Sequence, residues 1–462
     1  MNPASEPAKT NAWRAEAAKS KALYQRACQV MPGGNSRHSI ALAPYPIYAR
    51  SGRGCRITDV EGEERIDFLN NFTSLIRGHA DPQVTRAVHE RIDLGTAFTM
   101  PTEADVELAE LIAGRVPYIE QLRFCNSGSE AVMLTIKAAR AFTGRHKIAK
   151  FEGAYHGIYD YVQVSEGSTP DVWGEAARPA PVLEAGMPPS LAEDVIVLPW
   201  NNFKACEALI KAHQEQLAAV IVDALPVGIG MIAPQPGFIE FLREITERHG
   251  ILFIADEVLT FRLSYHGAMS PHGIRPDLTA LGKIIGGGFP VGAVGGSREA
   301  MSVFDHTGKL KVHHGGTYNA NPVTMTAGLQ TMRLMTEAEY ERLNRMGDYI
   351  RHGLREMLGE RGIPAVVNGA GSLFLAVLTD QELTDYRSLI GSYSRTNPTA
   401  VPLCHELLAR GIITSPRGIF GCLSTPMTEA ELDAFVAALD ESLTALNQQA
   451  GTQLPLNQDF AM

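Results

Sequence analysis

Between about residues 100 and 330 the chain alternates short apolar runs with amphipathic segments, and this alternation constrains the fold more than any other feature. The apolar runs predict strands at 121–125, 147–151, 195–198, 218–222, 251–255 and 291–294. The segments between them have helical periodicity and predict helices at 104–115, 129–143, 203–214 and 238–249. Because alternating strands and helices form βαβ units, we expect an α/β fold with a mostly parallel sheet flanked by helices. Ligands of such sheets bind at the carboxyl ends of the strands.

The two chain ends have a different pattern. An amphipathic segment at about 12–30 predicts a helix, and short alternating runs at 47–50, 55–60 and 65–69 predict an antiparallel meander. The C-terminal third predicts a strand near 372–378 and helices near 337–359, 402–410 and 429–446. We therefore expect a large domain at 76–335 and a smaller α+β domain formed by 1–75 and 336–446, followed by a loose tail at 447–462.

The bulk composition narrows the possible partners. With 462 residues, 45% of them hydrophobic, the chain can bury a large core. The net charge of −10 argues against nucleic acid or an anionic membrane as the main partner. Charged residues, prolines and glycines interrupt the long apolar stretches, so we expect no membrane span. The six cysteines are scattered and the N-terminus has no apolar signal segment, which together predict a cytoplasmic protein without disulfides or a metal site.

An acid and a lysine carry the chemistry. Asp256 closes the apolar run before it, and Lys283 stands between Leu281-Gly282 and Ile284-Ile285-Gly286-Gly287-Gly288. A lone lysine is usually a solvated surface residue, and an acid after a strand is often a turn residue. Pyridoxal phosphate (PLP) chemistry requires both groups, because the acid keeps the pyridine nitrogen charged and the amine forms the Schiff base. Val258 would then pack on the ring face.

Two polar loops are candidate phosphate-binding sites. Ser127, Gly128 and Ser129 follow a predicted strand and open a predicted helix, where backbone N–H groups bind anions well. Taken alone, such a triplet is more often a plain helix cap. Thr317, in the glycine-rich loop at 314–319, is a second candidate for a phosphate hydrogen bond, with helix capping as the alternative. Together with Asp256 and Lys283, these loops indicate a PLP enzyme.

Two arginines are candidate anchors for a substrate carboxylate. Arg37 follows Gly33-Gly34-Asn35-Ser36, and Arg417 lies in the Ser-Pro-Arg-Gly segment at 415–418. The guanidinium fork matches a carboxylate, although most loop arginines make only surface contacts.

These residues resemble the class III (ω-type) aminotransferases of PLP fold type I over most of the chain, from about Pro32 to beyond Thr428. The resemblance is carried by GHADP at 78–82, NSGSEA at 126–131, KFEGAYHG at 150–157, DEV at 256–258, PDLTALGKIIGGGFPVGAVGG at 276–296 and GGTYNANP at 315–322. Within the class, the chain resembles the branch of glutamate-1-semialdehyde aminomutases and β-amino acid aminotransferases. Thr260 directly precedes Phe261-Arg262, where the aminomutases carry a glycine, and this favours the second group.

The resemblance implies a role for each candidate. Lys283 is then the Schiff-base lysine, Asp256 is the pyridinium partner, and Ser127, Gly128 and Ser129 hold the phosphate. Thr317 reaches the phosphate of the neighbouring subunit, which implies a homodimer with shared active sites. The aromatic ring of Tyr155 stacks on the cofactor, while the role of His156 is left open. Arg37 binds the carboxylate of a β-amino acid and Arg417 that of an α-keto acid.

The expected reaction is therefore PLP-dependent transamination of a β-amino acid, aromatic such as β-phenylalanine, with 2-oxoglutarate or pyruvate as acceptor. The alternatives are a glutamate-1-semialdehyde aminomutase and an ω-amine transaminase acting on amines without a carboxylate. From other classes, a non-catalytic PLP-binding module and a nicotinamide dehydrogenase fit less well, because the chemical residues are all present and the glycines at 286–288 form no GxGxxG motif. Asp223 stands where many relatives have a Glu-Pro pair, which changes the expected wall near the cofactor.

Overall fold

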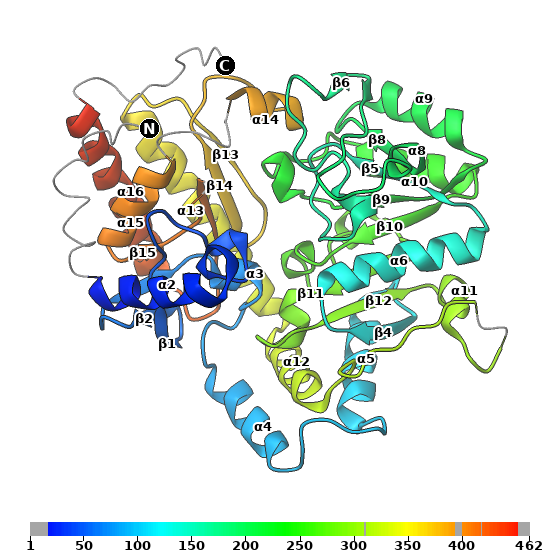
Figure 1. Ribbon diagram of the computed structural model, residues 1–462, viewed down its shortest axis with the longest axis horizontal. Helices are drawn as coiled ribbons and strands as arrows, with labels where there is room; N and C mark the ends of the chain where they lie inside the picture. Colours follow the sequence, from blue (N-terminus) through cyan, green and yellow to red (C-terminus); the bar gives the residue numbers. More distant parts are fainter. Residues whose placement is uncertain (1–16, 309–310, 393–399, 417, 451–462) are drawn as a thin grey trace.

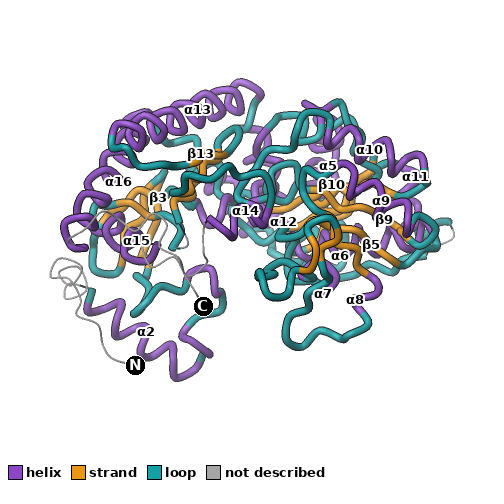
Figure 2. The backbone as a smooth tube through the Cα atoms, turned by 90° about the horizontal axis from the view of Figure 1, so that it is seen from above, coloured by secondary structure: helices purple, strands orange, loops and turns teal. Residues whose placement is uncertain are grey.

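The computed structural model describes residues 17–308, 311–392, 400–416 and 418–450 (Figure 1). The chain forms two groups of elements, one around a large sheet and one around two small sheets. Figure 2 shows both groups from above, with the strands at the centre of each and helices outside them.

The large sheet has seven strands in the order β4-β12-β11-β10-β9-β5-β8. The strands are β4 (Gln121–Cys125), β12 (Gly292–Gly296), β11 (Leu278–Gly282), β10 (Leu252–Asp256), β9 (Leu217–Val222), β5 (Lys147–Phe151) and β8 (Val195–Leu198). Only β12 runs antiparallel to its neighbours, and the other pairings are parallel. The expected mostly parallel sheet is confirmed.

Helices cover both faces of this sheet, and the strand residues alternate between them. Along β10, Leu252 and Ile254 pack into the core beneath helix α6 (Gly128–Thr143), whereas Phe253 and Ala255 pack on the opposite face with α10 (Phe238–Arg248). All of β10 is buried, which explains why its sequence is a continuous apolar run. The other large helices of this group are α4 (Pro82–Ile92), α5 (Glu103–Arg115), α9 (Phe203–His213) and α12 (Pro322–Leu334).

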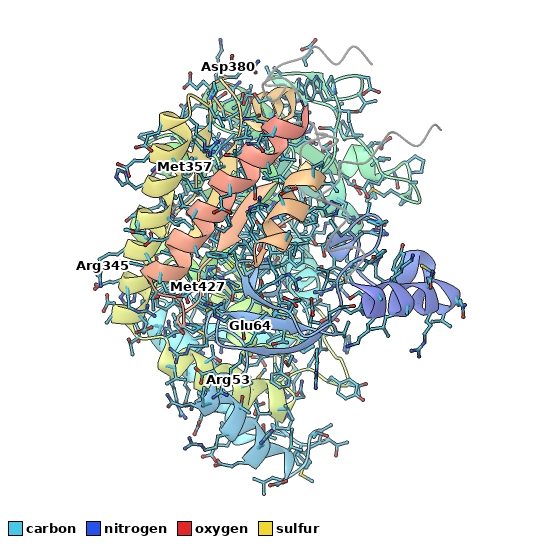
Figure 3. All side chains as sticks on the ribbon, turned by 90° about the vertical axis from the view of Figure 1, so that its left-hand side faces the viewer. Arg53, Glu64, Arg345, Met357, Asp380 and Met427 are labelled. Carbon is cyan, nitrogen blue, oxygen red and sulfur yellow. The ribbon has the colours of Figure 1, made fainter. Side chains whose placement is uncertain are left out.

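The second group joins the two ends of the chain. Strands β1 (Ala49–Arg53), β2 (Arg56–Asp59) and β3 (Glu64–Asp67) form the expected meander, and β15 (Ile412–Ile413) adds to β3 in parallel. A second sheet contains β13 (Val366–Asn368), β14 (Leu373–Val377) and β16 (Ile419–Cys422). The long helices α13 (Glu337–Glu360) and α16 (Glu429–Ala450) contact each other beside these sheets (Figure 3).

The first described helix, α2 (Ala18–Val30), projects from the rest of the chain in Figures 2 and 3. The smaller elements are α3 (Asn70–Thr73), α7 (Asp160–Gln163), β6 (Gly174–Glu175), β7 (Arg178–Pro179), α8 (Leu191–Asp194), α11 (Arg298–Met301), α14 (Tyr386–Ser392) and α15 (Ala400–Ala409), with the 3₁₀ turns η1 (Pro32–Gly34), η2 (His38–Ile40), η3 (Val227–Ile229), η4 (Thr260–Leu263), η5 (Ser270–His272), η6 (Lys283–Gly286) and η7 (Ser302–Phe304). Among the described residues, every helix is too short or too polar to cross a membrane.

Two expectations need correction. The apolar runs did not predict β11, because its Leu-Thr-Ala-Leu-Gly sequence is short and merges into the glycine-rich turn after it. The tail was expected from residue 447, but α16 continues to Ala450, and residues 451–462 lie outside the described part of the chain. The proposed domain boundaries stay a prediction.

Candidate functional site

The acid and the lysine expected to act together lie at the same edge of the large sheet. Asp256 is the last residue of β10, and Lys283 directly follows β11. The two strands are parallel neighbours, with Asp256 opposite Ala280 in the register, so both side chains leave the sheet at its carboxyl edge. Both line one cavity of about 390 Å³, here called the lysine pocket. Its other lining residues are Asn71, Phe72, Ser74, Asn126, Gly128, Ser129, Tyr155, His156, Gly157, Asp223, Val227, Val258, Leu259, Gly288, Phe289, Pro290 and Val291.

Lys283 has a strained backbone conformation, and the pKa of its amine is lowered. Its backbone has a φ of +48°, a left-handed conformation that a non-glycine residue adopts at a cost of about 1–3 kcal/mol. Burial lowers the pKa of its amine, against the opposing effects of the carboxylates of Asp256 and Asp223. A lowered pKa increases the fraction of free amine, which is the form that attacks a carbonyl.

Asp256 is fixed by two hydrogen bonds. Its Oδ2 accepts from Nδ1 of His156 at 2.7 Å, and its Oδ1 accepts from the backbone N–H of Val258 at 3.0 Å. His156 is buried, and burial lowers the pKa of its imidazole. Donation from Nδ1 leaves Nε2 of the neutral ring as an acceptor, and this buried Nε2 has no hydrogen-bond partner among the described residues. The pair therefore presents an oriented carboxylate and an unused acceptor within one pocket.

The start of α6 forms another part of the wall. Gly128 and Ser129 line the lysine pocket, and a Cβ on Gly128 would lie 2.6 Å from Cγ1 of Val258, so the close approach requires glycine. Ser127 is the helix cap, since its Oγ accepts from the backbone N–H of Glu130 at 3.2 Å. Its hydroxyl thus has the capping function considered from the sequence. The N-terminal N–H groups and the helix dipole give this wall a positive character.

Of the remaining residues expected at the site, two line the lysine pocket and one lies outside its lining. Tyr155 lines the lysine pocket with 52% of its surface exposed, and Val258 lines the same pocket. Thr317 is exposed and outside the lining of this pocket, and α12 is capped by Asn321 instead. Its expected contact with a neighbouring subunit stays a prediction. Arg417 lies outside the described residues.

Three buried side chains were missed or left open by the sequence argument. Asp223 follows β9 at the same sheet edge as Asp256, and burial, followed by the nearby charge of Asp256, raises its pKa to about 8. Glu257 is fully buried and accepts from the hydroxyl of Tyr118, and burial raises its pKa to about 7. His156 lies in the loop after β5 and is also buried. The sequence places Asp223 near the cofactor and leaves the role of His156 open, but the burial and hydrogen bonds that define their roles depend on the folded structure.

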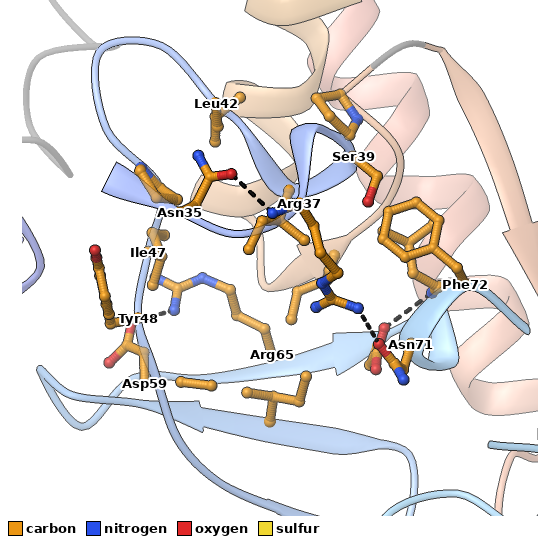
Figure 4. A pocket seen from close by; sticks show the side chains of 18 of the residues that line it. Asn35, Arg37, Ser39, Leu42, Ile47, Tyr48, Asp59, Arg65, Asn71 and Phe72 are labelled. Atoms are coloured by element: carbon orange, nitrogen blue, oxygen red, sulfur yellow. Dashed lines mark hydrogen bonds and ion pairs between the residues drawn. The ribbon is translucent and has the colours of Figure 1, made fainter. Parts of the chain in front are cut away.

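A second cavity adjoins the first and contains Arg37. It has a volume of about 720 Å³ and is here called the arginine cavity (Figure 4). It shares Asn71, Phe72 and Gly288 with the lysine pocket. Its apolar lining includes Ile40, Leu42, Ile47, Leu75, Leu408 and Ile413. Arg37 donates from Nη1 to Oδ1 of Asn71 at 2.8 Å, at the boundary between the cavities.

Comparison with known proteins identifies the class. The family model "Aminotransferase class-III" matches residues 40–443, and the chain belongs to this family. A glutamate-1-semialdehyde 2,1-aminomutase of Methanothermobacter thermautotrophicus is 40% identical over 93% of this chain and 99% of its own. An ω-transaminase structure from Sphaerobacter thermophilus has 49% identity and a TM-score of 0.90, over 94% of this chain and 99% of that one. A β-phenylalanine aminotransferase from Variovorax paradoxus has 34% identity and a TM-score of 0.85, over 97% and 98%.

The protein is therefore an aminotransferase of class III with PLP fold type I, and PLP is its cofactor. A solved transaminase with PLP bound, 41% identical over 94% of this chain and 99% of that one with a TM-score of 0.86, agrees with this assignment.

Proposed function

We propose that this enzyme transfers the amino group of a β-amino acid, aromatic such as β-phenylalanine, to 2-oxoglutarate or pyruvate. The observation that carries the proposal is the arginine cavity, in which an arginine without a carboxylate partner among the described residues stands beside an apolar space that adjoins the lysine pocket. A β-amino acid has its carboxylate one carbon further from the amine than an α-amino acid has. A separate arginine at the edge of the pocket suits that length, and the apolar lining suits an aromatic side chain.

In the lysine pocket, the residues fit PLP by the chemistry of their donors. PLP supplies an aldehyde for the amine and a ring that withdraws electrons. Lys283 would bind the aldehyde carbon and later move the proton of the substrate carbon, and Asp256 would keep the ring nitrogen charged, with His156 orienting its carboxylate. The N–H groups around Gly128 and Ser129 would hold the phosphate, while Tyr155 and Val258 would pack on the ring.

Two further residue roles and a dimeric assembly complete the proposal. Thr317 would reach the phosphate of a second subunit, and Arg417 would bind the carboxylate of the keto acid. A homodimer with shared sites is supported by exposed apolar residues on one segment, since Leu94 and Met100 are 70% and 76% exposed and Phe98 is 49% exposed.

A glutamate-1-semialdehyde aminomutase is the second candidate, and the curated relatives favour it more directly than the β-amino acid reaction. Several proteins of that name are 34–42% identical to this chain. The support for transamination comes from the ω-transaminase at 49% identity and from the apolar lining around Arg37, because glutamate-1-semialdehyde is small and polar.

A half-reaction separates the candidates. The purified holoenzyme is mixed with 3-amino-3-phenylpropanoate without acceptor, and the absorbance of the cofactor is followed. Conversion to the amino form of the cofactor, reversed by 2-oxoglutarate or pyruvate, would support the proposal. No conversion by the β-amino acid, together with isomerisation of glutamate-1-semialdehyde without any added keto acid, would replace it with the aminomutase.

A further inference from the structure

We infer that Asn71 is a positioning residue that holds the guanidinium of Arg37 at the boundary between the two cavities, ready for a substrate carboxylate. This inference rests on the proposed role of Arg37. It assigns to Asn71 the task of orienting the arginine without neutralising it.

Arg37 is held by hydrogen bonds to neutral groups. Its Nη1 donates to the amide oxygen of Asn71 at 2.8 Å, and its backbone N–H donates to Oδ1 of Asn35 at 3.0 Å (Figure 4). No carboxylate of the described residues forms an ion pair with it. A guanidinium has five N–H donors, so one bond to Asn71 leaves most of the fork free. A neutral amide acceptor fixes the direction of the side chain and leaves its positive charge uncompensated.

The other arginine in this lining gives a contrast. Arg65 forms an ion pair with the carboxylate of Asp59 and also donates to the backbone carbonyl of Leu408 at 3.0 Å. Its charge is therefore already compensated within the chain. Of the two arginines that line the described cavity, only Arg37 has an uncompensated charge that could bind an incoming anion. The side chain of Asn71 holds the guanidinium of Arg37 in place.

The backbone around Asn71 is strained. Residues 70–73 have φ values of +46°, +48°, +52° and +75°, four consecutive left-handed residues without a glycine. Each such residue costs roughly 1–2 kcal/mol, so the turn persists only because its surroundings hold it. Its effect is to bring Asn71 and Phe72 to the boundary, where both line both cavities.

Buried hydrogen bonds hold this turn at each end. Oδ1 of Asp67 accepts from the backbone N–H groups of Leu69 and Asn70, both at 2.9 Å. At the other end, the buried guanidinium of Arg262 donates to the carbonyl of Thr73 at 2.8 Å. The turn is thus anchored in the protein interior while Asn71 faces the cavity, as a positioning device requires.

Two substitutions distinguish the contribution of the Asn71 side-chain oxygen from that of the strained backbone. Asn71→Gly removes the side chain and keeps a residue that favours positive φ, so the turn is not strained further. Asn71→Asp keeps the shape and places a permanent carboxylate on Arg37, which competes with the ligand. The matched control is Ala80→Gly, since Ala80 has the same φ of +48° and carries no polar side chain.

The probes are 3-phenylpropanoate and its uncharged amide, 3-phenylpropanamide, as inhibitors of the holoenzyme. We expect Asn71→Gly to weaken binding of the carboxylate by about tenfold, the effect of losing one hydrogen bond to a charged group, and Asn71→Asp to weaken it more. Binding of the amide should stay unchanged in both variants. With the β-amino acid as substrate, KM should rise in parallel while kcat stays close to that of the wild type.

Equal weakening of the acid and the amide in Asn71→Gly would reduce Asn71 to a structural residue and overturn the inference. The same would follow if neither compound bound the wild-type enzyme. Arg37→Met on the same pair tests the proposed carboxylate site itself. If Arg37→Met loses the preference for the acid and Asn71→Gly keeps it, only the inference fails; if Arg37→Met keeps it, the proposed carboxylate site fails as well.

Discussion

The lysine pocket and the arginine cavity share three lining residues, but different parts of the fold form them. In the lysine pocket, Asp256 and Lys283 leave parallel neighbouring strands whose positions are fixed by the register of the sheet. In the arginine cavity, Arg37 lies in a loop before η2 and is oriented by the side chain of Asn71 on a strained turn. The first site depends on the core of the molecule, and the second depends on a few side-chain contacts.

This difference indicates how the two tasks can change separately. Moving Asp256 or Lys283 would require a shift of β10 or β11, which are buried throughout their lengths. Replacing Arg37 or a loop residue beside it changes only the cavity wall. The chemistry common to a family can therefore be kept by the sheet while the loops set which substrate is accepted.

The largest effect is expected at Lys283. Lys283→Ala removes the amine that the proposal uses for covalent binding and proton transfer, so we expect turnover to fall by about 10⁴-fold or more. The measurement is kcat with the β-amino acid and 2-oxoglutarate. Lys204→Ala, an exposed lysine on α9, serves as the control and should keep full activity. Normal turnover by Lys283→Ala would contradict the assignment.

The second largest effect is expected at Asp256, and a comparison with Asp223 tests whether the two acids have different protonation states. Asp256→Asn removes the charge that the proposal places opposite the ring nitrogen, and we expect kcat to fall by roughly 10²- to 10³-fold. Asp223→Asn should have a much smaller effect at pH 7, because burial and the charge of Asp256 raise the pKa of Asp223 to about 8 and keep it mostly protonated. Equal losses in the two variants would show that protonation does not distinguish these acids.

The same comparison explains what the sequence could predict. Most strands of the large sheet were predicted from apolar runs, because buried parallel strands have an almost continuous apolar sequence. Asp256 became a candidate because it directly follows such a run, and Gly128 because it lies three residues after another. Lys283 became a candidate because of its apolar, glycine-rich surroundings, since the strand before it was not predicted. Asn71 was not found, since its role depends on a turn held by Asp67 and Arg262, and Arg262 is far from it in the sequence.

The buried acid beside Asp256 gives a prediction for stability. Burial raises the pKa of Glu257 from 4.5 to about 7, so the folded state binds more protons than the unfolded state between these values. Its contribution to stability is present below pH 4.5 and is lost as the pH rises through 7, a total of roughly 3 kcal/mol. Glu257→Gln removes this titration and keeps a side chain able to bond Tyr118 and the N–H of Ala268.

Thermal denaturation of the two proteins at a fixed scan rate from pH 5 to pH 8 tests this. The midpoint of Glu257→Gln, relative to that of the wild type, should rise over this interval. A difference between the midpoints that does not vary with pH would mean that Glu257 is ionised throughout.

The smallest effect is expected in the wall of the arginine cavity. Leu42 lies in its apolar lining, and Leu42→Phe should reduce the space for an aromatic side chain (Figure 4). We expect kcat/KM for 3-amino-3-phenylpropanoate to fall by about tenfold, while the value for the smaller 3-aminobutanoate changes little, because small changes in apolar volume are worth about 1–3 kcal/mol. Val106→Phe, a similar increase in size on the exposed face of α5, is the control. If Leu42→Phe reduces both rates equally, the arginine cavity does not hold the substrate side chain, and the aromatic group must lie in the lysine pocket.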